Sequence, residues 1–253
     1  MIAAGIALAL TLAASAPGVD AAAIDAYRRG DYPAAKSLWI AALDAGKDEA
    51  GAALPAAERA RILYDVGNAA YRSGAPLEAV GWYTASLRLR PRDGDAWANL
   101  EHARRTAKLE PADRGDLAAT LWRLLTSITP AESEWIALAG AALCAVVLAA
   151  EALRGGRLLR RLSLVACALA LASLAPWIVH RARSDRDTLL VIEAAEGVAG
   201  VRSEPRAEAA VVANAAAGEE VERLDELPGW VKIVAPDGTA GWIESRAAFA
   251  LRR

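Results

Sequence analysis

The fold is decided by the stretch Trp135–Val179, which reads WIALAGAALCAVVLAAEAL-RGGRLLRR-LSLVACALALASLAPWIV. It contains two apolar runs of 19 and 18 residues, Trp135–Leu153 and Leu162–Val179. At a helical rise of about 1.5 Å per residue, each run covers most of a hydrocarbon layer roughly 30 Å thick. Because the segment between the runs is short and basic, the pattern predicts a two-helix transmembrane hairpin over residues 131–181, with spans at about 135–153 and 162–179.

The residues at the ends of the runs support this interpretation. Trp135 opens the first run and Trp177 nearly closes the second, so both indoles fall at one membrane interface. Thr129 and Glu132, with a proline at the first helical position, predict a capping box that starts the first span. A buried helix pair in a soluble protein is the alternative, but the length and the uncharged interior of the runs favour the membrane.

The distribution of arginine predicts the orientation of the hairpin. Residues 154–161 contain four arginines and no acid, whereas Glu132 and Glu134 precede the first span. The segment after the second span mixes Arg181, Arg183 and Arg186 with Asp185 and Asp187. The positive-inside rule therefore places loop 154–161 in the cytoplasm and both flanking regions outside. We expect a bacterial cytoplasmic (inner) membrane protein with two spans, whose soluble parts lie on the periplasmic side.

The composition excludes several classes of function. The chain has 253 residues and a formal net charge of -2, so no overall basic character points to nucleic acid. The two cysteines, Cys144 and Cys167, lie inside the apolar runs and are expected to be small packing residues. His102 and His180 are the two histidines, so metal and histidine-based nucleophilic chemistry are poorly supplied. We expect no cofactor, no metal site and no catalytic residue.

Residues 1–21 resemble a secretory signal peptide. An apolar run from Ile2 is followed by small residues, with a possible cleavage site after Ala21. The usual basic residue near Met1 is missing, so an uncleaved N-terminal anchor is the alternative. Either interpretation directs the following domain out of the cytoplasm.

Residues 22–110 contain an internal sequence repeat. YRRGDYPAAKSLWIAAL at residues 27–43 is repeated in altered form as GNAAYRSGAPLEAVGWYTASL at residues 67–87, which closes at Pro91. Small residues, aromatics and a closing proline at these offsets resemble the tetratricopeptide repeat, an all-α helix-pair repeat. The offset of 44 residues, from Tyr27 to Tyr71, exceeds the usual length of about 34, and the excess falls in a predicted loop at 44–57. A third first helix is predicted at 95–105.

The concave face of such an array is the predicted binding surface. An asparagine amide both donates and accepts hydrogen bonds, which suits the backbone of an extended peptide. The resemblance places two asparagines and several basic residues there, and the predicted groove residues are Asn68, Arg72, Asn99, His102 and Arg105. Tyr64 stands where a carboxylate-binding lysine is usual, so a general peptide groove is favoured over a carboxylate clamp. A solvated surface without a ligand is the alternative.

Two further segments flank the hairpin. Residues 111–130 carry leucines at helical spacing and predict an amphipathic connecting helix, which either caps the repeats or lies on the membrane surface. Residues 188–253 change to short strands with turn signals, including a tight turn at Pro236–Gly238. The motifs VRSEP, GEEV, WVKI and GWI resemble the bacterial SH3 domain, a small all-β barrel of five strands. Trp230 and Trp242 are then expected to be framework residues.

The order of these parts resembles that of BatE-like proteins of the Bacteroides aerotolerance (Bat) system. The resemblance rests on GNAAYRSG at 67–74, NLE at 99–101 and LTSITP at 125–130. It implies a non-catalytic scaffold that acts in envelope stress beside a MoxR-type ATPase and membrane proteins with von Willebrand factor A domains.

Two functions therefore remain in competition. The first is a scaffold that binds protein partners through its repeats. The second is a cell-wall-binding protein whose SH3-like domain binds peptidoglycan peptide. An enzyme is disfavoured because no nucleophile elbow, metal-binding pair or phosphate-binding loop is present in the sequence.

Overall fold

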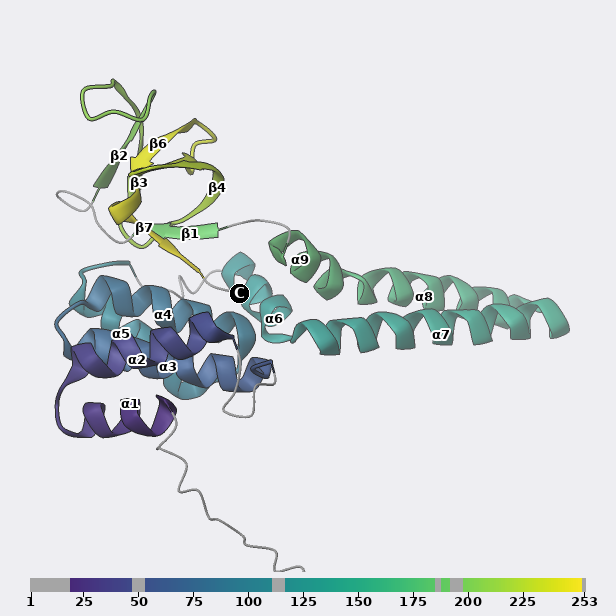
Figure 1. The fold of residues 1–253 in the computed structure, drawn as a ribbon. Helices are drawn as coiled ribbons and strands as arrows, with labels where there is room; N and C mark the ends of the chain where they lie inside the picture. Colours follow the sequence, from purple (N-terminus) through teal and green to yellow (C-terminus); the bar gives the residue numbers. More distant parts are fainter. Residues whose placement is uncertain (1–18, 47–52, 111–116, 185–187, 192–197, 252–253) are drawn as a thin grey trace, which may run out of the picture.

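A computed structural model describes residues 19–46, 53–110, 117–184, 188–191 and 198–251. Figure 1 shows three parts: an N-terminal helical domain, a long helical hairpin that projects from it, and a C-terminal barrel seated on the helical domain. The predicted signal segment falls on residues 1–18, outside the described residues, except for its last positions. Those positions begin α1 (Val19–Arg28), so the helical domain starts before the predicted cleavage site.

The helical domain is built from antiparallel helix pairs. Its helices are α1, α2 (Tyr32–Ala45), α3 (Ala56–Arg72), α4 (Pro76–Leu89) and α5 (Gly94–Thr106). The turns α1–α2 and α3–α4 are equivalent, since Gly30 and Gly74 both have a φ of +82° and both follow the same pattern of backbone hydrogen bonds. The internal sequence repeat therefore corresponds to a repeated helix–turn–helix structure. Part of the predicted loop 44–57 is helical, and residues 47–52 lie outside the description.

Small residues bring the helices of the second pair together. A Cβ on Gly67 of α3 would lie 2.7 Å from the ring of Tyr83 on α4. Tyr83, Trp39 and several alanines are buried in the core of this domain. The internal sequence repeat thus marks core residues, except at Gly30 and Gly74. These two glycines are exposed and lie in the turns, where they adopt a positive φ.

The hairpin consists of α7 (Pro130–Arg154), α8 (Arg157–Ser173) and α9 (Ala175–Ser184), preceded by α6 (Leu117–Ser127). Two segments are long and apolar enough to span a membrane, Ala131–Arg154 and Arg157–Ala182, and the most apolar windows of these segments are 0% and 17% buried. The helix core of a soluble protein would be covered, so these exposed apolar surfaces suggest membrane association. The second predicted span is interrupted at Leu174, because Pro176 cannot continue the hydrogen bonding of α8.

Local contacts fix the hairpin. The predicted capping box is present, with the Glu132 amide donating to Thr129 Oγ1 and the Thr129 amide donating to Glu132 Oε2. A Cβ on Gly140 would lie 2.3 Å from Ser173 Oγ, so α7 and α8 approach closely there.

The C-terminal part is an antiparallel sheet rolled into a small barrel (Figure 1). In the described part its order is β3-β2-β6-β5-β4-β1-β7, with bounds β1 Thr188–Val191, β2 Val198–Arg202, β3 Val211–Ala216, β4 Glu220–Leu227, β5 Trp230–Val234, β6 Ala240–Glu244 and β7 Ala248–Ala250. The predicted turn joins β5 to β6, with Gly238 at a φ of +86°. The expectation of five strands was wrong, because β3 and β7 are rich in alanine and carry no strong strand pattern.

The barrel packs directly on α4 of the helical domain. The Phe249 and Trp82 rings meet edge to face, with centroids 4.8 Å apart. Arg88 donates to Thr188 Oγ1 over 2.6 Å and to Glu220 Oε2 over 2.7 Å. Two other apolar side chains, Leu190 of β1 and Leu251 directly after β7, are buried in the core of the helical domain. The barrel therefore contributes to the core of the helical domain and also has a separate core of its own.

Candidate binding groove

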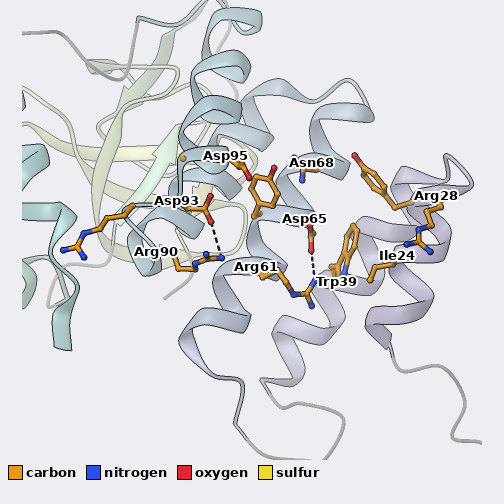
Figure 2. Close-up of a pocket in the computed structure, with 13 residues that line it drawn as sticks. Ile24, Arg28, Trp39, Arg61, Asp65, Asn68, Arg90, Asp93 and Asp95 are labelled. Atoms are coloured by element: carbon orange, nitrogen blue, oxygen red, sulfur yellow. Dashed lines mark hydrogen bonds and ion pairs between the residues drawn. The ribbon is translucent and has the colours of Figure 1, made fainter. Parts of the chain in front are cut away.

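A pocket of about 870 Å³ lies on the side of the helical domain formed by α1, α3 and the start of α5 (Figure 2). These are the first helices of the successive pairs, and Trp39 of α2 and the loop before α5 complete the lining. Tyr27, Trp39 and Tyr64 give the pocket an aromatic wall. Charged side chains surround this wall, so the pocket offers both apolar contact and ion pairing.

Arg61 is the centre of an ion-pair cluster in the pocket. Its guanidinium contacts Asp65 Oδ2 at 2.8 Å, Asp20 Oδ2 at 2.8 Å and Glu58 Oε1 at 2.5 Å. Asp20 also accepts a hydrogen bond from Trp39 Nε1 over 2.9 Å. The cluster therefore ties α1 and α2 to α3, and Asp20 is part of it although Asp20 precedes the predicted cleavage site.

The cluster holds more negative than positive charge. Burial raises the pKa of Asp65 to about 6, the positive charge of Arg61 opposes this rise, and the charge of Asp20 adds to it. The pKa of Arg61 is raised chiefly by its hydrogen bond to Glu58, against the effect of its own burial. With its three carboxylates ionised the cluster carries a net charge of -2, and protonation of Asp65 reduces that charge as the pH falls through about 6.

The two predicted asparagines lie side by side. Asn68 Oδ1 accepts from Tyr83 Oη over 2.8 Å and from Asn99 Nδ2 over 3.0 Å, and Asn99 Nδ2 also reaches Tyr64 Oη at 3.0 Å. Asn68 lines the pocket, whereas Asn99 supports it from α5. Burial raises the pKa of Tyr83, which keeps its hydroxyl a donor to Asn68. In the described part of the chain Asn68 Nδ2 has no protein acceptor and can donate to a ligand carbonyl.

The other three predicted groove residues do not line this pocket. Arg72 donates to Tyr32 Oη, with Nη2 at 2.9 Å, and stacks over the same ring. The His102 ring packs 5.2 Å from the ring of Tyr71, and Arg105 is exposed on α5. The structure thus brings Asn68 and Asn99 together but does not place Arg72, His102 and Arg105 with them.

Sequence reasoning missed most of the charged groove residues. Arg61 and Asp65 lie two turns and one turn before Asn68 on the same face of α3, so helical spacing could have identified them. The loop residues Arg90, Arg92 and Asp93 reach the pocket through the turn between α4 and α5. The sequence signals for that turn are Pro91, which closes the second repeat, and Asp93, the N-cap of α5, which accepts from the Ala96 amide.

Comparison with known families bears on the C-terminal barrel. Residues 197–247 match the family described as bacterial SH3 domain. These residues form a bacterial SH3 domain. The match covers β2 to β6 of the SH3 domain, while β1 and β7, which hold it against α4, lie outside the match. The similarity of the helical domain to tetratricopeptide repeats stays a prediction. No curated protein and no solved structure matches the chain.

Proposed function

We propose that this chain is a non-catalytic, membrane-anchored scaffold that binds an extended segment of a partner protein in the groove, on the periplasmic side. The observation that carries the proposal is the pocket of about 870 Å³ on the first-helix face, where an aromatic wall stands beside an asparagine amide. Aromatic surface binds side chains, while the Asn68 amide binds a backbone carbonyl. This proposal takes the helix pairs to be tetratricopeptide repeats.

The charges at the rim add selectivity to this groove. Arg28 at the end of α1 and Asp95 in the first turn of α5 are exposed, line the pocket and have no ion-pair partner among the described residues. Each is available to a residue of opposite charge in the partner. A bound segment that carries both an acidic and a basic residue therefore fits the groove better than a uniformly charged one.

The resemblance to the Bat system supplies candidate partners. In this reading the chain acts with a MoxR-type ATPase and with membrane proteins that carry von Willebrand factor A domains, in aerotolerance or another envelope stress. The SH3 domain supports a binding role, because domains of this family often bind proteins or peptidoglycan. Its docking on α4 leaves the first-helix face open to a partner.

The test compares charge reversals on and off the groove. The full chain in nanodiscs is titrated with a purified von Willebrand factor A domain from the same organism, and affinity is read by biolayer interferometry. We expect Arg28→Glu to weaken binding about tenfold, which corresponds to about 1.4 kcal/mol. Arg105→Glu, the matched control outside the pocket, leaves affinity unchanged. Equal affinities for both variants, or no binding by the unaltered chain, would refute the groove proposal.

The SH3 match favours a second candidate function, in which this domain binds the peptide of peptidoglycan and the helical domain acts as a spacer. Its test uses the full chain, because Leu190 and Leu251 are buried in the helical core and an isolated SH3 domain would expose them. Failure of the detergent-solubilised chain to sediment with isolated sacculi would remove this candidate. Sedimentation that muramidase digestion abolishes would support it.

A further inference from the structure

α6 carries an apolar face that the protein does not cover. Leu117, Leu121 and Leu124 follow one another at spacings of four and three residues, so they share one side of the helix. Their exposed fractions are 76%, 52% and 62%. The sequence left open whether this helix caps the repeats. Such exposure shows that these leucines do not pack on the helical domain, so another apolar phase must cover them.

The position of α6 indicates that this apolar phase is the lipid of the membrane. α6 ends at Ser127, and the first apolar span begins at Ala131. α6 also packs against α9, where His180 Nε2 donates to the Ile128 carbonyl over 2.5 Å and fixes the corner between α6 and α7. Figure 1 shows α6 turning away from the line of the hairpin at the end nearest the soluble domains. The helix therefore lies where the hairpin leaves the membrane.

Exposed aromatic residues lie at the same end of the hairpin as α6. Trp135 in the first turns of α7 is 73% exposed, and Trp177 in α9 is 41% exposed. Indoles at the ends of membrane spans occupy the headgroup region. The three leucines of α6 continue this exposed apolar surface sideways from the two spans.

We infer that α6 is an in-plane membrane helix, whose three leucines enter the lipid at the outer interface while its opposite side faces the soluble domains. The attraction is apolar, because Leu117–Ser127 contains one basic residue, Arg123, and no acidic one. Binding of α6 therefore does not depend on anionic lipid, in contrast to amphipathic helices with a strongly basic face.

This placement brings the groove close to the membrane. Arg92 lines the pocket, and its guanidinium donates to both oxygens of Glu132, over 3.0 and 3.1 Å, in the first turn of α7. This ion pair attaches the helical domain to the outer end of the hairpin. A ligand of the groove would then be a segment that lies near the same membrane surface.

The test measures the depth of α6 in the full chain. Single cysteines that carry nitroxide labels replace Leu117, Leu121 or Leu124 in a background with Cys144→Ala and Cys167→Ala, in phosphatidylcholine vesicles. Collision rates with oxygen, which concentrates in lipid, and with a water-soluble nickel chelate report the surroundings of each label. Labels at Leu143 on α7 and Ser37 on α2 serve as the lipid and water references, so insertion of the hairpin is checked independently.

We expect labels at the three leucine positions to give an oxygen-to-nickel ratio several-fold above that of Ser37 but below that of Leu143, which lies near the middle of α7. Adding phosphatidylglycerol leaves the ratio unchanged. With Leu121→Asp and Leu124→Asp combined, the label at Leu117 moves toward the Ser37 value. Ratios equal to that of Ser37 would overturn the inference, and so would labels shielded from both reagents, which would indicate a protein partner or a second copy on this face.

Discussion

Removal of the Phe249 ring should release the last strand of the SH3 domain from the helical domain. The ring lies edge to face on Trp82 and so close to α4 that a Cβ on Gly81 would stand 2.6 Å from its Cδ1 atom. Phe249→Ala deletes this contact without changing the β1–β7 pairing, which uses backbone groups. The substitution therefore tests whether the ring holds the two soluble parts together.

The size of the effect follows from burial. Replacement of a fully buried phenylalanine by alanine costs about 3–5 kcal/mol, and an aromatic pair adds about 0.5–1.5 kcal/mol to simple burial. Because Phe249 is only partly buried, we expect about half of the full cost, roughly 2 kcal/mol. When amides exchange through local opening at equilibrium, a loss of roughly 2 kcal/mol corresponds to about 30-fold faster exchange of the amides of Ala248–Ala250.

A double-mutant cycle with Gly81→Ala separates this contact from general destabilisation. In the unaltered chain Gly81→Ala forces the ring to move and speeds exchange in β7 (Ala248–Ala250). In the Phe249→Ala background the added methyl meets no ring, and alanine stabilises the helix by about 1 kcal/mol relative to glycine. Leu227→Ala, on an exposed part of β4, is the control and leaves β7 exchange unchanged. Additive effects of the two substitutions, or unaltered β7 exchange in Phe249→Ala, would refute the reasoning.

Three further substitutions test the interior of the molecule. Gly67→Ala should lower the free energy of unfolding in urea by about 1–2 kcal/mol, because its Cβ would lie 2.7 Å from the hydrogen-bonded ring of Tyr83; unchanged stability would show that the ring can move. Since the pKa of Asp65 is raised from 3.8 to about 6 in the folded chain, ionisation of this group costs stability as the pH rises from about 4 to about 6, and the whole cost is present above pH 6. The chain should therefore gain about 1–2 kcal/mol relative to Asp65→Asn between pH 7.5 and pH 4.5, and a constant difference would exclude this titration. Gly140→Leu should lower thermal stability in detergent by about 1–3 kcal/mol, because even a Cβ there would stand 2.3 Å from Ser173 Oγ; an unchanged melting curve would mean that the spans can separate freely.

Local patterns in the sequence predicted local structure well. The segment at Thr129 anticipated the capping box of α7, and the internal sequence repeat marked two equivalent turns, although the repeat pattern predicts packing roles for its glycines Gly30 and Gly74. Each of these features depends on residues within about one helical turn of one another, so spacing alone is informative. The apolar period likewise located α7, although the break at Leu174 required attention to the proline that follows it.

Contacts between distant segments were beyond the sequence. Arg61 and Asp20 are 41 residues apart, and Arg88 and Glu220 are 132 residues apart. Charged residues at such separations look like ordinary solvated positions until the fold brings them together. For the same reason the sequence located two asparagines that meet but added Arg72, which is engaged by Tyr32 instead.

The docking of the SH3 domain on α4 bears on topology independently of the arginine pattern. A chain that crosses a bilayer twice returns to the side from which it started, so an even number of spans places residues before α7 and after α9 in one compartment. The contacts of Phe249 with Trp82 and of Arg88 with Glu220 require the same arrangement, because neither pair could form across a bilayer roughly 30 Å thick. A single-span reading, in which the break at Leu174 prevents the second helix from crossing, would separate these partners by the membrane. The interface on α4 therefore disfavours a single crossing, whereas an even number of crossings, none or two, satisfies it.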